Sequence, residues 1–154
     1  MAAHLLDTNI LLRFCDSACA EHSMVRNTIT MMWQNGEETF VTPQNFIEFW
    51  AVATRPVGNN GLGWTSTQTR QELDQVRNQF PLLEDKAEVF PRWLDLVTTH
   101  QIKGKKVHDA RLAAVMFAHG LTHLLTLNPS DFDGIPGLTL VHPANIPAPP
   151  PVAS

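Results

Sequence analysis

The stretch His4-Leu5-Leu6-Asp7-Thr8-Asn9-Ile10-Leu11 decides the fold class of this chain. Its first three residues form an apolar run that is too short for a helix and ends at an acid, so we expect a short buried strand that stops at Asp7. Similar short apolar runs recur along the chain and alternate with segments in which apolar residues have helical spacing. This alternation predicts an α/β fold with a mainly parallel sheet.

The remaining elements follow from the same patterns and from local stop signals. Further strands are expected at 39–41, 82–83, 122–127 and 138–141. One helix is expected to end at 35–36. Four more are expected at 43–54, about 65–79, about 86–101 and 108–119, and Gly120 should end the last of them. The carboxyl ends of consecutive parallel strands should then lie on one edge of the sheet, where sites form in open α/β folds.

Composition limits the class of protein. The chain has 154 residues, of which 44% are hydrophobic, and this favours one globular domain over a disordered chain. Acids outnumber bases by 15 to 11, so a surface that is cationic throughout is excluded, although a local basic patch is not. No apolar run is long enough to cross a membrane. Cys15 and Cys19, four residues apart, are expected to share a helix face as buried reduced thiols, which favours a cytoplasmic location.

The C-terminal end differs from the rest in composition. Five of the eleven prolines fall between Pro143 and Ser154. We therefore expect a folded domain at residues 1–143 and a flexible Pro-rich tail at 144–154.

Four acids coincide with the predicted edge of the sheet or with a neighbouring helix start: Asp7, Glu48, Asp109 and Asp131. Each has a structural explanation when taken alone, because an acid after a strand often caps a helix and an acid in a first helical turn suits the helix dipole. Their common edge favours a functional site. Gathered carboxylates repel one another unless cations neutralise them, and Mg²⁺ takes oxygen ligands of this kind. Two such ions can activate water and stabilise the leaving oxygen of a phosphodiester.

These segments resemble the PIN-domain nucleases and, among them, the VapC-type toxins of type II toxin–antitoxin systems. The resemblance spans residues 4 to about 143. It rests on four stretches in order, which are Leu5-Leu6-Asp7-Thr8-Asn9-Ile10-Leu11, Asn45-Phe46-Ile47-Glu48-Phe49-Trp50 with Thr54-Arg55-Pro56, His108-Asp109-Ala110-Arg111-Leu112-Ala113-Ala114, and Leu125-Thr126-Leu127-Asn128-Pro129-Ser130-Asp131-Phe132.

The resemblance implies a three-layer α/β/α PIN-like fold and a metal-dependent endoribonuclease with a two-metal-type mechanism. Mg²⁺ or Mn²⁺ would be held by the four acids, and hydrolysis would leave a 5′-phosphate and a 3′-hydroxyl. Asn9 and Thr126 would orient carboxylates or water. Either Asp131 or Asn128 supplies the fourth polar group, and Thr42 stands where the family commonly has a hydroxyl residue. The implied partners are RNA, a small antitoxin that lies across the catalytic groove, and a second copy of the chain in a homodimer.

Basic side chains near these motifs are candidates for contacts to RNA phosphates. They are Lys103, Lys105, Lys106, Arg55 and Arg111. A solvated loop is the alternative interpretation of the three lysines.

Two other functions fit part of the pattern. One is a phosphoacceptor receiver-like signalling domain, which would want two adjacent acids after the first strand and a Lys after the last strand, and the chain has neither. The other is a catalytically inactive PIN-like module that binds RNA.

Overall fold

The computed structural model describes residues 2–149 and contains a four-stranded sheet in which all strands are parallel. The strands are β1 (Ala3–Leu6), β2 (Glu38–Phe40), β3 (His123–Leu125) and β4 (Thr139–Val141), in the spatial order β2-β1-β3-β4. The predicted α/β class and the mainly parallel sheet are confirmed.

The described residues also form six α-helices and three short 3₁₀ helices, which are joined by loops and turns. The α-helices are α1 (Thr8–Cys15), α2 (His22–Gln34), α3 (Pro43–Thr54), α4 (Ser66–Gln79), α5 (Val89–Thr99) and α6 (Lys106–Ala118). The 3₁₀ helices are η1 (Val57–Asn59), η2 (Pro129–Phe132) and η3 (Pro143–Asn145). No helix within residues 2–149 combines the length and the apolar character needed to cross a membrane.

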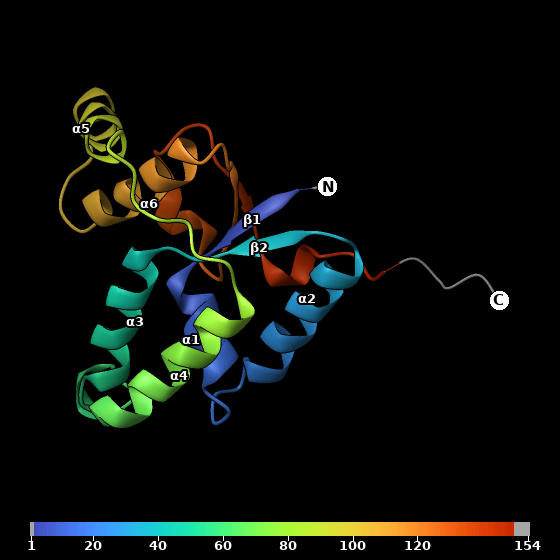
Figure 1. The fold of residues 1–154 in the computed structure, drawn as a ribbon. Helices are drawn as coiled ribbons and strands as arrows, with labels where there is room; N and C mark the ends of the chain where they lie inside the picture. Colours follow the sequence, from blue (N-terminus) through green and yellow to red (C-terminus); the bar gives the residue numbers. More distant parts are fainter. Residues whose placement is uncertain (1, 150–154) are drawn as a thin grey trace.

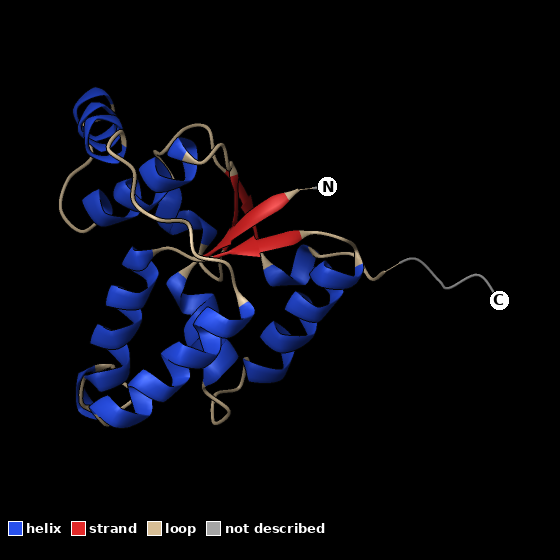
Figure 2. Ribbon diagram, viewed as in Figure 1, coloured by secondary structure: helices blue, strands red, loops and turns tan. Residues whose placement is uncertain are grey.

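The sheet separates two hydrophobic cores, because successive side chains of a strand point to opposite faces. Leu5 and Leu124 face the core that α6 and the inner side of α5 complete, whereas Leu6 and Leu125 face the core formed with α1, α2, α3 and α4. Figures 1 and 2 show the same division, with the strands between one group of four helices and the pair α5 and α6. The implied three-layer arrangement is confirmed.

Local sequence explains where the two helices nearest the sheet edge begin. Thr42 caps α3 in a capping box with Asn45, and Pro43 occupies the first helical turn, where a missing N–H costs nothing. The middle of α6, residues 112–116, is fully buried between the sheet and α5, and the small residues Ala110, Ala113 and Ala114 allow this close packing.

Several predicted details are wrong. The apolar pair at 82–83 forms only an isolated parallel bridge between Val41 and Leu82, not a strand of the sheet. Helix α5 starts three residues later than predicted, and α6 starts two residues earlier, so Lys106 is helical. Cys19 lies beyond the end of α1 and so shares no helix face with Cys15; both are free thiols of intermediate exposure.

The first residues of the Pro-rich segment contact the domain. Pro143 is buried in η3, Ile146 packs on the core beneath α2, and Asn35 Nδ2 donates to the carbonyl oxygen of Pro147 at 3.1 Å. Packed structure therefore continues a few residues past 143. The last part of the predicted tail, residues 150–154, lies outside the described residues.

Candidate active site

Asp7 stands where β1 turns into α1, and both of its carboxylate oxygens accept hydrogen bonds. Oδ1 accepts from the backbone N–H of Thr8 at 2.8 Å, and Oδ2 accepts from Thr126 Oγ1 at 2.7 Å. The Thr126 hydroxyl is fully buried and also receives N–H groups from Asn9 Nδ2 at 3.4 Å and from the Asn128 backbone at 3.1 Å. Since those two groups only donate, the Thr126 proton must point at Asp7.

Glu48 lies on α3 and is oriented by a hydroxyl of α1. Thr8 Oγ1 donates to Glu48 Oε1 at 2.8 Å and accepts from Asn45 Nδ2 at 3.1 Å. Asn45 cannot be flipped, because its Oδ1 accepts the backbone N–H of Thr42 at 2.8 Å. The capping box of α3 therefore fixes the direction in which Thr8 donates.

Asp109 and Asp131 lie in the same region as Asp7 and Glu48 but come from the C-terminal part of the chain. Asp109 is in the first turn of α6, and Asp131 lies in η2, the short helix that follows β3. Asn128 is exposed at the N-terminal boundary of η2 and makes no side-chain cap there. Asp131 lines the cleft described next, and Asn128 is not among the residues that line it.

All four acids line one cleft at the carboxyl ends of β1 and β3. It consists of two adjoining hollows of about 380 and 820 Å³ that share Glu48, Ala51, Arg55, Asp109 and Asp131, and Asp7 lines the smaller of them. The expectation that these acids meet at one edge thus agrees with the geometry, even though their sequence positions span more than a hundred residues.

Burial and mutual repulsion disfavour ionisation of two of these carboxyl groups. The pKa of Asp7 is raised to about 6, mainly by burial. The charges of Glu48 and Asp131 act in the same direction, and the hydrogen bonds from Thr126 and Thr8 oppose the rise. Burial also raises the pKa of Asp109 to about 7, and the negative charges of Asp7, Glu48 and Asp131 add to the effect. Lys106 opposes it only partly. A cation in the cleft would relieve both costs.

Some of the predicted basic residues lie at this cleft and others do not. Lys105, Lys106 and Arg55 line the larger hollow together with His108, so positive charge flanks the acids. Lys103 is exposed and is not among the residues lining either hollow. Arg111 turns away toward Asp85, to which its Nη2 is bonded at 3.2 Å.

Sequence reasoning missed three residues that hold the site: Thr8, Gln44 and Asn45. A Thr-x-x-Asn pattern at the start of α3 is a capping signal that pointed to Asn45. Thr8 and Gln44 carry no such signal, because their contacts reach 40 and 64 residues along the chain.

The donor set suits a hard divalent cation, since the cleft offers carboxylate oxygens and no thiol. Within residues 2–149, however, no three side chains of His, Cys, Asp or Glu are arranged to hold one ion. Hydrogen bonds hold Asp7 to Thr126 and Glu48 to Thr8. Mg²⁺ keeps several waters and is often bound through one or two carboxylates, so the residues present fit such an ion.

The cleft lies at the carboxyl ends of the strands, which is where ligands bind in open α/β sheets. The PIN-domain family model matches residues 4–138, and the chain therefore belongs to the PIN-domain family. A comparison with curated proteins gave no match.

Solved structures share the fold at low sequence identity. VapBC2 from Rickettsia felis, solved with a DNA fragment from its promoter, has 17% identity and a TM-score of 0.70, covering 91% of this chain and 98% of that chain. VapBC-1 from nontypeable Haemophilus influenzae has 14% identity and a TM-score of 0.68, with coverage of 93% and 99%. VapC20 from Mycobacterium tuberculosis, a toxin that cleaves the sarcin–ricin loop, has 14% identity and a TM-score of 0.55, with coverage of 79% and 86%.

Proposed function

We propose that this protein is a metal-dependent endoribonuclease and the toxin of a toxin–antitoxin pair. One observation carries the proposal: Asp7, Glu48, Asp109 and Asp131, contributed by four separate segments, line one cleft. A purely structural role for each acid does not account for four carboxylates in one cleft, where burial first and the neighbouring negative charges second raise the pKa of Asp7 and of Asp109.

The comparisons support the choice of substrate and biological class. The similar structures named above include VapBC assemblies and a toxin described as cleaving the sarcin–ricin loop. Carried over to this chain, these descriptions make RNA the proposed substrate and a small antitoxin the proposed partner. The cytoplasm, where such a toxin would meet RNA, is the proposed location. A homodimer is part of the same proposal.

The residues of the cleft have different roles, according to their chemistry. Asp7 and Glu48 are held in fixed directions by Thr126 and Thr8, so little ordering remains when a ligand binds. Lys105, Lys106 and Arg55 place positive charge where phosphates on either side of the cleaved bond would lie. The exposed position of Asp131 leaves its carboxylate free to turn toward a ligand.

The four acids are the groups that would bind Mg²⁺ or Mn²⁺. Such ions would supply positive charge for the phosphate and an activated water, in a two-metal-type hydrolysis that leaves a 5′-phosphate and a 3′-hydroxyl. The cleft itself contributes oxygen donors, a basic rim, and partial exclusion of solvent around Asp7.

The test is cleavage of total bacterial RNA and of a random pool of labelled single-stranded RNA, with Mg²⁺ or Mn²⁺ and with EDTA. We expect cleavage only with the metal, and a loss of at least about 100-fold in Asp109→Asn and Asp131→Asn, because removal of groups that merely support metal ligands already costs about 10–100-fold. Asp133→Asn is the matched control, since Asp133 is exposed and is not among the residues lining the cleft. Cleavage in EDTA, or equal activity in all variants, would refute the proposal.

The same measurement separates the alternative that the chain is an inactive module. Such a module would bind RNA without cutting it, and binding would be unaffected by Asp109→Asn. The receiver-like alternative has no support in the comparisons, which place the chain in the PIN-domain family.

A further inference from the structure

Gln44 is a polar side chain buried to all but 7% at the start of α3, one turn before Glu48. Its amide nitrogen Nε2 donates to the carbonyl oxygen of His108 at 2.7 Å and lies 3.4 Å from Glu48 Oε2. Its oxygen Oε1 accepts from Arg111 Nη1 at 3.0 Å. Every strong hydrogen-bonding atom of this amide is therefore engaged.

The orientation of the Gln44 amide is fixed by the nature of its partners. A guanidinium group only donates, and a backbone carbonyl oxygen only accepts. The oxygen of Gln44 must therefore face Arg111, and its NH₂ group must face His108 and Glu48.

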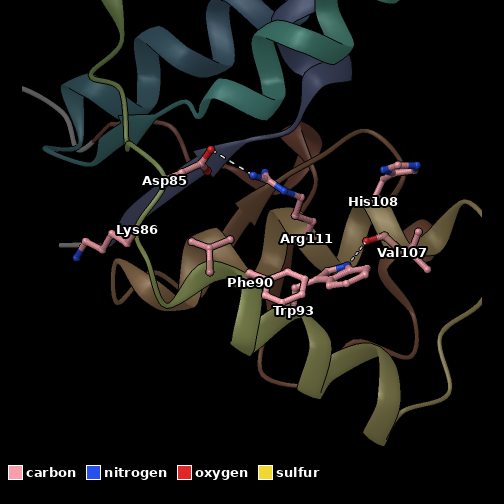
Figure 3. A pocket seen from close by; sticks show the side chains of 8 residues that line it. Asp85, Lys86, Phe90, Trp93, Val107, His108 and Arg111 are labelled. Carbon is pink, nitrogen blue, oxygen red and sulfur yellow. Dashed lines mark hydrogen bonds and ion pairs between the residues drawn. The ribbon is translucent and has the colours of Figure 1, made fainter.

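Arg111 is itself anchored from outside the cleft. Figure 3 shows its side chain leaving α6 toward Asp85, which lies on the segment that precedes α5. The ion pair between Arg111 Nη2 and Asp85 Oδ2 measures 3.2 Å and is partly exposed. The guanidinium is thus held from two sides, by Asp85 and by Gln44.

The two contacts of the Gln44 NH₂ group join the segments that carry two of the acids. Glu48 is on α3, and the His108 carbonyl belongs to the peptide unit directly before Asp109 on α6. We propose that Gln44 is a positioning residue that fixes Glu48 relative to Asp109, with Arg111 and Asp85 holding its amide in place. The inference rests on the proposed nuclease function, because it assigns a role within that site.

A change at Gln44 should act on the cation and not on the RNA. Without its amide, Glu48 Oε2 loses a donor and α3 loses a tie to α6, so the carboxylates are less well placed to share a cation. Lys105 and Arg55 are untouched, and RNA binding should be retained.

The experiment compares Gln44→Met with Gln71→Met, which makes the same chemical change at an exposed position of α4. Calorimetric titration of the RNA-free full chain with Mn²⁺ measures both affinity and the number of sites, and cleavage assays separate kcat from KM. We expect about tenfold weaker Mn²⁺ binding with unchanged stoichiometry in Gln44→Met, a lower kcat at limiting Mn²⁺, and an unchanged KM for RNA. Gln71→Met should match the unmodified chain.

The outcomes distinguish this role from its alternatives. Fewer Mn²⁺ sites per chain at unchanged affinity would mean that Gln44 only supports folding, and this would overturn the proposal. Equal behaviour of the two Met variants, in a chain that does bind Mn²⁺ and cut RNA, would overturn the positioning role alone. Absence of both Mn²⁺ binding and cleavage in the unmodified chain would remove the proposed function and this inference with it.

A second variant covers the case in which Gln44→Met does not fold. Gln44→Asn keeps the amide but is one methylene shorter, so it cannot span from α3 to the His108 carbonyl and Glu48 together. The same loss of Mn²⁺ affinity is expected, and an unchanged affinity in a folded Gln44→Asn would overturn the proposal.

Discussion

Replacing Asp7 by Asn should abolish cleavage and, in the absence of metal, make the folded protein more stable. The reason is that the ionised carboxylate is costly where it sits. Burial raises its pKa from 3.8 to about 6, so the folded state binds a proton more tightly than the unfolded chain does. The favourable contribution of the protonated group is complete below pH 3.8 and is lost as the pH rises through about 6.

The size of the effect follows from that difference in pKa. The pKa of Asp7 rises by about two on folding, and each step of one in pKa is worth about 1.4 kcal/mol. Ionised Asp7 is therefore unfavourable to the folded state by about 3 kcal/mol at pH 8. Asn keeps one acceptor where Asp7 uses two oxygens, for Thr8 and Thr126, and its NH₂ group then faces one of these two donors without a partner, which offsets about 2 kcal/mol. The net gain is about 1 kcal/mol, or roughly 2–4 °C in Tm for a domain of this size.

The assay is urea unfolding with EDTA, followed by the fluorescence of the four tryptophans, at pH 8 and pH 5. The cost of ionised Asp7 falls by about half at pH 5, where folded Asp7 is largely protonated, so the advantage of Asp7→Asn should disappear there. Asp133→Asn should change stability by less than about 0.5 kcal/mol. An Asp7→Asn variant that is less stable than the unmodified chain at pH 8, or whose advantage does not shrink at pH 5, would refute the conclusion that burial makes the ionised Asp7 carboxylate unfavourable.

Two further predictions concern buried polar groups. Thr126→Val removes the hydroxyl that donates to Asp7 at 2.7 Å, so the free energy of unfolding at pH 8 should fall by about 1.5–3 kcal/mol. The decrease should be smaller at pH 5, where the Asp7 acceptor is no longer charged, and an equal decrease at both pH values would contradict this. Burial lowers the pKa of His4 from 6.5, helped by the charge of His123 and opposed by that of Glu37, so its contribution is complete above pH 6.5 and is lost as the pH falls below it. His4→Leu should therefore flatten the decline in stability below pH 6.5, and an unchanged pH profile in urea titrations would show that His4 is not responsible.

Much of the fold could be predicted from local sequence. A strand ending at Asp7, the capping signals before α3 and α4, and the stop at Gly120 each depend on neighbouring residues, and the elements appear at those places. The predicted strand at 82–83 failed because a short apolar pair does not reveal whether it has a partner along its whole length, and Leu82 finds only Val41.

The candidate site could be predicted only in part. The acids stand out because parallel strands bring their carboxyl ends to one edge, which requires no knowledge of side-chain contacts. The residues that orient those acids do not stand out. Thr8 and Gln44 look like ordinary positions at helix starts, and Arg111 looks like a phosphate ligand although it is paired with Asp85 and Gln44.

The sequence by itself determined the four strands of the sheet and most of the helices, which acids lie at their ends, and that the chain resembles a PIN domain. Only the tertiary structure decided the direction of each hydrogen bond. Thr126, for example, donates to Asp7 because Asn9 and Asn128 both donate to the Thr126 hydroxyl. Periodicity and capping act over a few residues. The contacts that orient Asp7 and Glu48 join groups 119 and 40 residues apart, and they exist only once both layers of helices have closed on the sheet.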